Sequence, residues 1–457
     1  MPGGGATSPA IFAGVAPPPP RSAGYLAVGI LLILYALSVL DRQILALLVE
    51  DIKQDLTLTD VEFSALQGIA FALFYGLFAL PIGWLVDKWS RRWIIYLGVT
   101  CWSIATAACG AAQNFSQLFA ARAAVGAGEA SLAPAGQSIL ADMFPPDRLS
   151  FAMTMFTLGA GIGTGLAFFL GGPLVELVRG WGTLSLPLLG DLAPWRTVMM
   201  LVGLPGILIA LAIFLLPEPR RRTIVAPGDA GAANAGGFMR FVRTNRTFLL
   251  LHHGGFGLLQ LALIGMQLWM PAYMSRSFGW AVGETGVWMG AIMIVTAIIG
   301  LPMHGALVDR LFRKGTLDAH MSWYGRICLI TAPVALLAFT SGTAIVSLAG
   351  FAVVYLLLLG GPGIGSASLQ IVAPGHLRGK LAATYMLVTG LIGGAAGPMA
   401  IAMMTDLVLQ DEARLGVSIA VVAGGAAALS GLMLLAGRGA MVRCAQNIRR
   451  TDAGTGL

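Results

Sequence analysis

Two ten-residue stretches decide the fold of this chain: GWLVDKWSRR at residues 83–92 and GALVDRLFRK at residues 305–314. Each joins a long apolar segment to a short basic loop, and a spacing of 222 residues separates them. The same spacing relates Glu62 to Glu284 and Gly68 to Gly290. A register that holds over about thirty residues indicates an internal repeat, so the chain consists of two similar halves.

Each stretch combines a small Gly, an Asp and a basic cluster, which together favour a tight turn between two helices. The Gly permits close helix approach, the Asp can accept hydrogen bonds from a neighbouring helix N-terminus, and the basic residues anchor the turn at an anionic leaflet. We therefore expect the turns to act as latches that hold one arrangement of the halves. The expected latch residues are Gly83, Asp87, Arg91, Arg92, Gly305, Asp309 and Arg313.

The composition excludes a soluble protein. Of the 457 residues 57% are hydrophobic and 11% are charged, and the mean hydropathy is +0.82. Such a chain cannot cover its surface with polar groups in water, and a helix needs about 20 apolar residues to cross a bilayer. Twelve such spans are predicted, at residues 24–48, 63–86, 93–112, 116–143, 151–177, 195–216, 248–276, 286–308, 322–340, 344–372, 379–405 and 415–437.

The distribution of basic residues predicts the topology. A net charge of +7 would suit nucleic-acid binding, but most of the 28 basic residues lie in alternate loops, as Lys88, Arg220 and Arg310 do. Loops rich in Lys and Arg stay in the cytoplasm, and an even number of crossings then places both termini there. We expect a monomeric multi-pass protein of the inner (plasma) membrane that binds no nucleic acid.

The long polar loop that contains Pro217 and Pro219 is the natural linker between the halves. The first residues are rich in Pro, Gly and Ala and lack the basic start and apolar core of a signal peptide. The expected organisation is a disordered cytoplasmic tail at 1–23, a six-helix bundle at 24–216, a cytoplasmic linker at 217–246, a second six-helix bundle at 247–440 and a cytoplasmic tail at 441–457.

Four ionisable residues lie inside apolar spans of the first half: Asp41, Arg42, Arg122 and Glu129. Ionisable groups in hydrocarbon need a partner or a water-filled cavity, so each is a functional candidate. Arg122, Gly126 and Glu129 recur at i, i+4 and i+7 and share a helix face that can point into a central cavity. If Asp41 and Glu129 approach each other there, their repulsion favours protonation of one of them. The cluster can then couple protons to conformation; a permanently paired structural network is the alternative.

Arg42 is either structural or steers substrate, because it points about 100° away from Asp41 on the same helix. The four Cys and five His residues lack metal-ligand spacing, so no metal is expected. No Walker phosphate loop, HExxH motif or nucleophile elbow is present. We expect neither an enzyme nor an ATP-driven pump, and no cofactor beyond a proton gradient.

The repeated turn resembles the signature loop of the major facilitator superfamily. Further matches are LFAARAAVGAGEA from Leu118 and the Gly-rich fifth span. The resemblance covers the chain after Gly24 and implies an all-α integral membrane protein of twelve transmembrane helices in two pseudo-symmetric six-helix bundles. It also implies that the fifth and eleventh spans lie at the interface of the halves. For the pairs Gly159 with Gly163 and Gly390 with Gly394 in these spans we expect close helix packing through a small-residue face.

Within the superfamily the chain resembles the Spinster transporters of sphingosine-1-phosphate and lysophospholipids and their bacterial relatives. The similar stretches are LDRQILALLVEDIK from Leu40, GIAFALFYGLFALPIGWLVDKWSRRWII from Gly68, RAAVGAGEASLAPAGQSILADMFPPDR from Arg122 and WMPAYMSRSFG from Trp269. The resemblance implies proton-coupled lipid transport with a polar core at Asp41, Arg122 and Glu129. The stretch 180–194 is longer and more apolar than that family leads us to expect.

The second half contributes almost no charge within its spans, but offers scattered amide, hydroxyl and aromatic side chains, which suits an amphipathic cargo. The expected substrate-binding residues are Arg122, Arg42, Gln267, Trp269 and Tyr385. The leading hypothesis is a proton-coupled carrier of sphingolipids or lysophospholipids whose halves rock around a central site. A multidrug or small organic anion transporter is the second hypothesis, and a non-transporting scaffold or sensor is the third.

Overall fold

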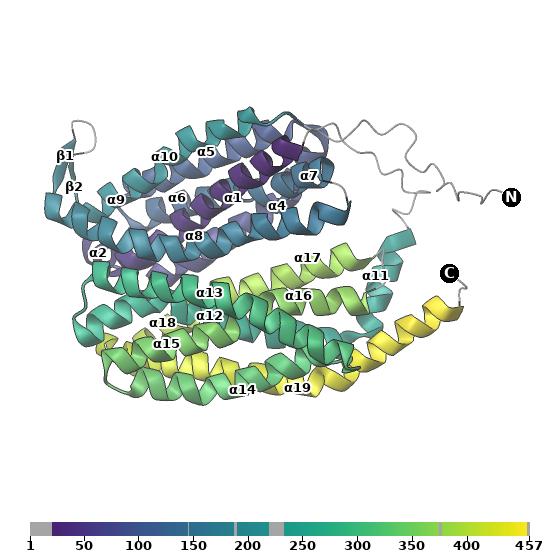
Figure 1. The fold of residues 1–457 in the computed structure, drawn as a ribbon. Helices are drawn as coiled ribbons and strands as arrows, with labels where there is room; N and C mark the ends of the chain where they lie inside the picture. Colours follow the sequence, from purple (N-terminus) through teal and green to yellow (C-terminus); the bar gives the residue numbers. More distant parts are fainter. Residues whose placement is uncertain (1–20, 145, 187–189, 219–232, 374–376, 455–457) are drawn as a thin grey trace.

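The computed structural model describes residues 21–144, 146–186, 190–218, 233–373 and 377–454. Figure 1 shows two helical bundles side by side, the first in purple to teal and the second in teal to yellow. In the described residues the strands are confined to one antiparallel hairpin, β1 (Leu184–Leu186) and β2 (Gly190–Leu192), with Leu184 opposite Leu192. It lies in the stretch 180–194 that the sequence marks as unusual.

The first bundle contains long helices interrupted by short 3-10 or π segments. Its elements are α1 (Arg21–Gln43), η1 (Ile44–Leu48), α2 (Val49–Leu56), α3 (Asp60–Ser64), η2 (Ala65–Ile69), α4 (Ala70–Lys88), α5 (Arg91–Cys109), α6 (Phe115–Glu129), α7 (Leu132–Met143), α8 (Pro146–Trp181), α9 (Pro194–Gly203), α10 (Pro205–Ala210) and η3 (Leu211–Leu215).

The second bundle follows a linker of which residues 219–232 lie outside the described part. Its elements are α11 (Ala233–Thr244), α12 (Arg246–Phe278), α13 (Val282–Arg313), α14 (Ala319–Thr340), α15 (Ala344–Leu358), α16 (Gly361–Val372), α17 (Arg378–Thr389), η5 (Gly390–Ala395), α18 (Ala396–Met403), η6 (Met404–Leu409), η7 (Glu412–Arg414) and α19 (Leu415–Gly454). The expected tail at 1–23 lies outside the described residues up to position 20.

Eleven helical segments of the described chain are long and apolar enough to cross a membrane. The predicted fourth span, 116–143, is not among them; it carries Arg122, Glu129 and Asp142, and the chain turns at Ala130 and Ser131 between α6 and α7. With α6 and α7 taken as one interrupted span, the structure is consistent with the expected twelve.

Both described chain ends lie at the same end of the bundles, which we call the terminal end (Figure 1). The β hairpin marks the opposite end, which we call the hairpin end. The loop between α4 and α5 and the loop between α13 and α14, which carry the two signature stretches, both follow spans that run from the hairpin end to the terminal end.

Glycines bring α8 and α13 together at the hairpin end, and we call this contact the α8–α13 seam. A Cβ on Gly286 would lie 2.8 Å from the Cα of Gly172, and one on Gly172 would lie 2.9 Å from the carbonyl oxygen of Val282. The two backbones therefore touch in the manner of small-residue helix pairs in membranes.

The two predicted glycine pairs differ in their surroundings. A Cβ on Gly159 would lie 2.6 Å from the carbonyl oxygen of Leu32, so Gly159 and Gly163 pack against α1 within the first bundle rather than between the halves. A Cβ on Gly390 or Gly394 would meet nothing within 4 Å. The close packing expected of Gly159 and Gly163 is confirmed, but within the first bundle. The implied position of the two spans at the interface of the halves is also confirmed, because α8 contacts α13, and η5, which holds Gly390 and Gly394, contacts η2.

A second contact between the bundles joins α3 and η2 to α18 and η5, and we call it the α3–α18 seam. Both η2 and η5 are π-helical segments, which shift the backbone relative to a regular helix. A Cβ on Gly68 would lie 3.0 Å from the carbonyl oxygen of Gly394, and the Ser64 hydroxyl donates to the carbonyl oxygen of Pro398 at 3.2 Å.

We predict that Gly286→Val forces the bundles apart at the hairpin end, because the added side chain overlaps the backbone of α8. Spin labels at the exposed residues Thr183 and Ser277 should report a longer distance than in the parent. Gly161→Val on α8 is the control, since a Cβ there meets nothing within 4 Å. An unchanged distance in the Gly286 variant would contradict the close packing of this seam.

Candidate functional site

The four ionisable residues of the first half gather between α1 and α6. Arg42 Nη2 lies 2.6 Å from Glu129 Oε2, and the Ser38 hydroxyl donates to the same oxygen at 3.0 Å. Glu129 is 3% exposed, so this ion pair is shielded from solvent on the carboxylate side. The sequence suggested that Arg122 and Glu129 act together on one helix face; in the structure the ion-pair partner of Glu129 is Arg42 instead.

Arg42 is held by an irregularity of the backbone. The α-helix ends at Gln43 and continues as the 3-10 segment η1, and Gln67 Nε2 donates to the carbonyl oxygen of Arg42 at 3.2 Å. The guanidinium carbon lies 4.3 Å from the centroid of the Phe71 ring, an arrangement that favours a cation. Elements α1, η2 and α4 therefore orient a side chain that sequence spacing alone left ambiguous.

Asp41 and Arg122 are both 0% exposed, and neither forms an ion pair among the described residues. The Asp41 carboxylate lies beside the indole of Trp102, and the guanidinium nitrogens of Arg122 have no acceptor in the described part of the chain. Both act electrostatically on each other and on Glu129, and Glu129 Oε1 is also without a partner. A buried ion without a partner costs several kcal/mol. Chemically, the cluster can take a proton on a carboxyl group and can offer the guanidinium of Arg122 to an anionic group.

Of the predicted substrate residues of the second half, Gln267 and Trp269 lie on α12 and Tyr385 lies on α17. Gln267 is buried on α12. Trp269 Nε1 donates to the carbonyl oxygen of Pro398 at 3.0 Å, and its ring meets Phe63 edge to face in the α3–α18 seam. The hydroxyl of Tyr385 donates to the carbonyl oxygen of Pro362 at 3.0 Å inside the second bundle.

An interbundle charge network at the hairpin end was missed by the sequence reasoning. Asp60, 0% exposed, accepts from Lys53 and from Arg276 Nη1 and Nη2 at 2.7 and 2.8 Å. Glu412 lies 2.8 Å from Lys53 Nζ and 3.4 Å from Arg276 Nη2, and Arg276 also pairs with Glu50 at 2.8 Å. Three residues of the first bundle and two of the second are thus held together, which closes this end.

The signal that could have indicated this network is the scarcity of basic residues on that side of the sequence. Lys53 and Arg276 are two of the few cations predicted there, and each adjoins a span end. Since Asp60 and Arg276 are more than two hundred positions apart, however, no local pattern connects them.

The first signature stretch forms a charge network at the terminal end. Arg91, 1% exposed, pairs with Asp142 and with Glu218 at 3.0 Å, while Arg92 Nε lies 3.3 Å from Glu218. The Ser90 hydroxyl donates to Glu218 at 2.6 Å. Glu218, the last residue described before the gap in the linker, therefore ties the loop after α4 to the end of the sixth span.

The remaining predicted latch residues contact little in this conformation. A Cβ on Gly83 or on Gly305 would meet nothing within 4 Å. Asp309 and Arg313 of the second stretch are exposed, and the side chain of Asp87 lies outside the described part of the structure. Arginines of the first signature stretch therefore form ion pairs, whereas Asp309 and Arg313 of the second are exposed.

Burial by itself would raise the pKa of Glu218, but hydrogen bonds from Ser90, from the Arg91 side chain and from the Arg92 and Arg91 amides outweigh it and lower that pKa below its ordinary value. A carboxyl with a lowered pKa stabilises the folded state above the ordinary value, and the stabilisation disappears as pH falls through the folded-state pKa. The network is therefore intact at neutral pH.

We predict that Glu218→Gln lowers the melting temperature in detergent at pH 7, and that the difference from the parent shrinks as pH falls below the ordinary glutamate value and through the lowered pKa of Glu218, where its carboxylate becomes protonated. Glu284→Gln is the control, because that exposed carboxylate has no partner among the described residues. A difference that stays constant with pH would mean that the charge of Glu218 is not what stabilises the network.

We predict that Asp60→Asn opens the hairpin end, because removing one partner of a buried ion pair costs about 3–5 kcal/mol. Spin labels at the exposed positions Gln54 and Ser277 should show a longer distance, or a second, longer distance population. Asp55→Asn is the matched control, since Asp55 binds Trp195 and Arg196 of its own bundle. Equal distances in both variants would argue that the network does not hold the bundles together.

Comparison with known proteins gives a consistent set of similarities. The profile of the Major Facilitator Superfamily matches residues 31–398. An MFS-type efflux pump of Mycolicibacterium smegmatis is 25% identical over 393 residues, 86% of either chain. Protein spinster homolog 1 of Xenopus tropicalis is 25% identical over 410 residues, which is 85% of this chain and 74% of that protein.

Among solved structures, a bacterial homolog to the human lysosomal transporter Spinster, in an inward-facing and unoccupied conformation, superposes with a TM-score of 0.76 at 22% identity. The superposition covers 94% of this chain and 98% of that one. A D-xylose-proton symporter superposes with a TM-score of 0.67 at 13% identity, over 90% of this chain and 97% of that chain. At such identities the likeness shows the fold of the chain, whereas its cargo has to be argued from the site.

Proposed function

From the premise that this chain belongs to the Major Facilitator Superfamily and is a membrane transporter, not an enzyme, we propose that it moves a single-chain amphipathic lipid in exchange for, or together with, protons. The proposed cargo is of the sphingolipid or lysophospholipid type. The proposed mechanism is alternating access, in which the bundles rock about a central site.

The observation that carries proton coupling is the unequal pairing of charges in the cluster between α1 and α6. Glu129 is paired with Arg42, whereas Asp41 and Arg122 are buried without an ion-pair partner among the described residues. A neutral acid is less costly to bury than a carboxylate, so Asp41 is the proposed proton carrier in this conformation. Once Asp41 loses its proton, its charge attracts Arg122 and competes with the Arg42–Glu129 pair, which changes how α1 and α6 are held.

The same cluster supports an anionic or zwitterionic head group. Arg122 has three nitrogens free to donate to a phosphate, and charge-assisted bonds of this kind are short and strong. Arg42, Gln267, Trp269 and Tyr385 remain the proposed further contacts. Trp269 and Tyr385 would reach a lipid only after their present bonds to the carbonyls of Pro398 and Pro362 have changed.

The lipid assignment extends the resemblance of the sequence to the Spinster transporters and agrees with the scattered polar side chains among the apolar residues of the second half. Several similar proteins are called spinster or spinster homologs. We further propose that the protein lies in the inner membrane as a monomer, with its terminal end in the cytoplasm and with lipid and protons as its partners. In that orientation the hairpin end, which the Asp60 network closes, faces outward.

A second candidate is a proton-coupled exporter of drugs or small organic anions. It is favoured by the similarity to the mycobacterial efflux pump, which is as close in identity as the spinster homologs. The two candidates share the fold and the proton site and differ only in cargo. A scaffold or sensor without transport would show no substrate-driven change of conformation.

We predict that proteoliposomes take up a fluorescent lysophospholipid faster when a pH gradient is imposed. In Asp41→Asn and Glu129→Gln the stimulation should fall by about tenfold or more, because an amide cannot exchange the proton that links the gradient to conformation. Asp55→Asn, which alters a carboxylate outside the cluster, should keep the parent's stimulation.

The Asp41 and Glu129 variants could instead keep both the uptake rate and the pH dependence of the parent. That result would contradict the proposed proton coupling. If several lysophospholipids and sphingoid lipids are not taken up at all, while an organic anion or drug is, the second candidate replaces the lipid carrier.

A further inference from the structure

The two seams between the bundles involve corresponding positions of the internal repeat, so their residues can be compared directly. In the α3–α18 seam the amide of Val61 donates to Asp406 at 2.9 Å, and in the α8–α13 seam the amide of Gly283 donates to Glu176 at 3.4 Å. Val61 and Gly283 correspond at the spacing of the repeat. Each seam thus brings a carboxylate of one bundle onto the first turn of a helix of the other, where the helix dipole favours negative charge.

The glutamate that follows each of these amides is used differently in the two halves. Glu62 completes a capping box with Thr59, accepting from its amide at 2.9 Å while its own amide donates to the Thr59 hydroxyl at 3.1 Å. Its repeat counterpart Glu284 follows Ala281 at the cap position, which has no side-chain oxygen. Within the described chain the exposed carboxylate of Glu284 has neither a hydrogen bond nor an ion pair.

The charge balance of the seams differs as well. In the α3–α18 seam, Lys53 and Arg276 neutralise Asp60. The counterpart of Asp60 in the α8–α13 seam is the apolar Val282, and the cation present is Arg179. Arg179 is already engaged by Glu176 at 3.0 Å and by Asp51 at 2.8 Å.

Three carboxylates, those of Asp51, Glu176 and Glu284, therefore stand against the single guanidinium of Arg179 at the α8–α13 seam. In the α3–α18 seam each cation pairs with carboxylates of both bundles, whereas Arg179 pairs only within its own bundle and leaves Glu284 without a cation in the described structure. The α8–α13 seam therefore carries excess negative charge that no ion pair between the bundles offsets among the described residues.

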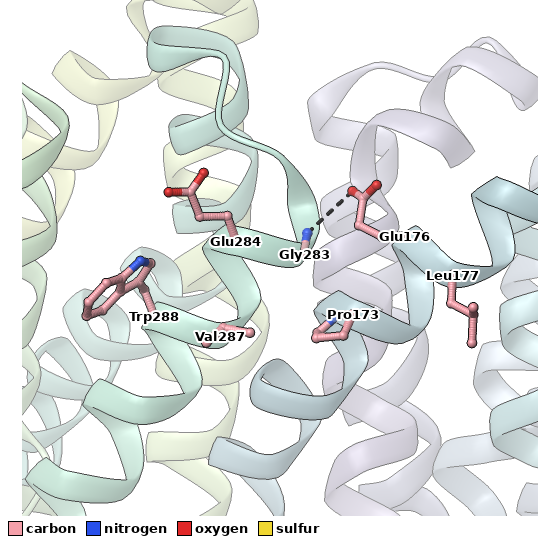
Figure 2. Close-up of a pocket in the computed structure, with 7 residues that line it drawn as sticks. All are labelled: Pro173, Glu176, Leu177, Gly283, Glu284, Val287 and Trp288. Atoms are coloured by element: carbon pink, nitrogen blue, oxygen red, sulfur yellow. Dashed lines mark hydrogen bonds between the residues drawn. The ribbon is translucent and has the colours of Figure 1, made fainter.

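A cavity of about 640 Å³ lies in this seam between α8 and α13 (Figure 2). Glu176 and Glu284 lie on the same side of it, one from each bundle, and the remaining walls are apolar: Pro173 and Leu177 on α8, Val287 and Trp288 on α13. Leu177 and Trp288 are 56% and 51% exposed, on helices that we assign to membrane spans. The cavity thus opens towards the lipid while its acidic end lies near the helix termini.

We propose that the α8–α13 seam is a binding site for a membrane amphiphile with an ammonium head group. The ammonium lies between Glu176 and Glu284, where charge-assisted hydrogen bonds compensate the excess negative charge. The hydrocarbon chain lies along Pro173, Leu177 and Val287, and the indole of Trp288 faces the boundary between head group and chain. This site is distinct from the proposed transport site in the first bundle.

A metal ion fits these residues less well than an ammonium group. Ca²⁺ takes about 6–8 oxygen ligands and Mg²⁺ requires near-octahedral oxygen geometry. The cavity offers two carboxylates among apolar walls, and the described residues contain no group of three or more His, Cys, Asp or Glu side chains placed to hold a metal.

Occupation of this site would act on the conformation of the transporter. The ammonium would contact both bundles while the hairpin end is closed, and separation of α8 from α13 would pull Glu176 and Glu284 apart. Because a ligand favours the state that it binds more tightly, the amphiphile stabilises the closed hairpin end.

The test uses the full chain in lipid vesicles and two photoreactive probes of equal length, a dodecylammonium and a dodecyl sulfate, each with a diazirine at the end of its chain. The ammonium probe should label peptides of α8 and α13 around Leu177 and Trp288, and the sulfate probe should not. Glu284→Gln should reduce this labelling by about tenfold, and the double change with Glu176→Gln should abolish it. Glu62→Gln, at the repeat counterpart, should leave it unchanged.

Equal labelling by the two probes, labelling that persists in the double variant, or an equal loss in Glu62→Gln would overturn the proposal. Loss of labelling on addition of Ca²⁺ or Mg²⁺ at micromolar concentration would also overturn it, in favour of a metal site. Binding is measured without a pH gradient and without transport, so its result is independent of whether the lipid-carrier function holds.

Discussion

The hydrocarbon interior of a membrane offers no hydrogen-bond partners, and the structure of this chain depends on that constraint. Helices satisfy the hydrogen bonds of the backbone. An ionisable side chain within a span needs a partner of opposite charge or a hydrogen-bond partner from another part of the chain. The Arg42–Glu129 pair, the Asp60 network and the Arg91–Glu218 network are three solutions to this problem, at the middle and at the two ends of the molecule. Asp41 and Arg122 are the exception, since neither forms an ion pair among the described residues.

The two halves of the repeat differ in how they place charged residues in the seams between the bundles. Both halves bring a helix N-terminus against a carboxylate of the other half, through Val61 and Asp406 in one seam and Gly283 and Glu176 in the other. In the α3–α18 seam, further ion pairs and a capping box engage the nearby charged side chains. In the α8–α13 seam the corresponding positions hold Ala281 and Val282, whose side chains form neither a capping box nor an ion pair. This seam contains the cavity with two carboxylates. Small differences between repeats thus give one seam the features of a latch and the other those of a ligand site.

Helix ends and irregularities position most of the functional groups. Arg42 is oriented where α1 changes into a 3-10 segment, and the π-helical η2 and η5 meet across the α3–α18 seam. The break between α6 and α7 follows directly after Glu129, so the fourth span is discontinuous next to its own charged residue. Of these departures from regular helix, η2 and η5 lie in a seam between the bundles, where an irregular segment allows backbone movement without loss of a whole helix.

The sequence by itself determined the membrane environment, the number of spans, the two-fold repeat and the four ionisable residues of the first half, because hydropathy, periodicity and charge are local properties of the chain. Tertiary structure alone decided that Arg42 rather than Arg122 pairs with Glu129, that Gly159 and Gly163 face α1, and that Asp60 meets Arg276. These outcomes depend on the rotation of each helix about its axis and on contacts between residues far apart in the chain. Helical spacing gives the shared face of two residues, but the neighbour that fills it is known only when both bundles have been packed together.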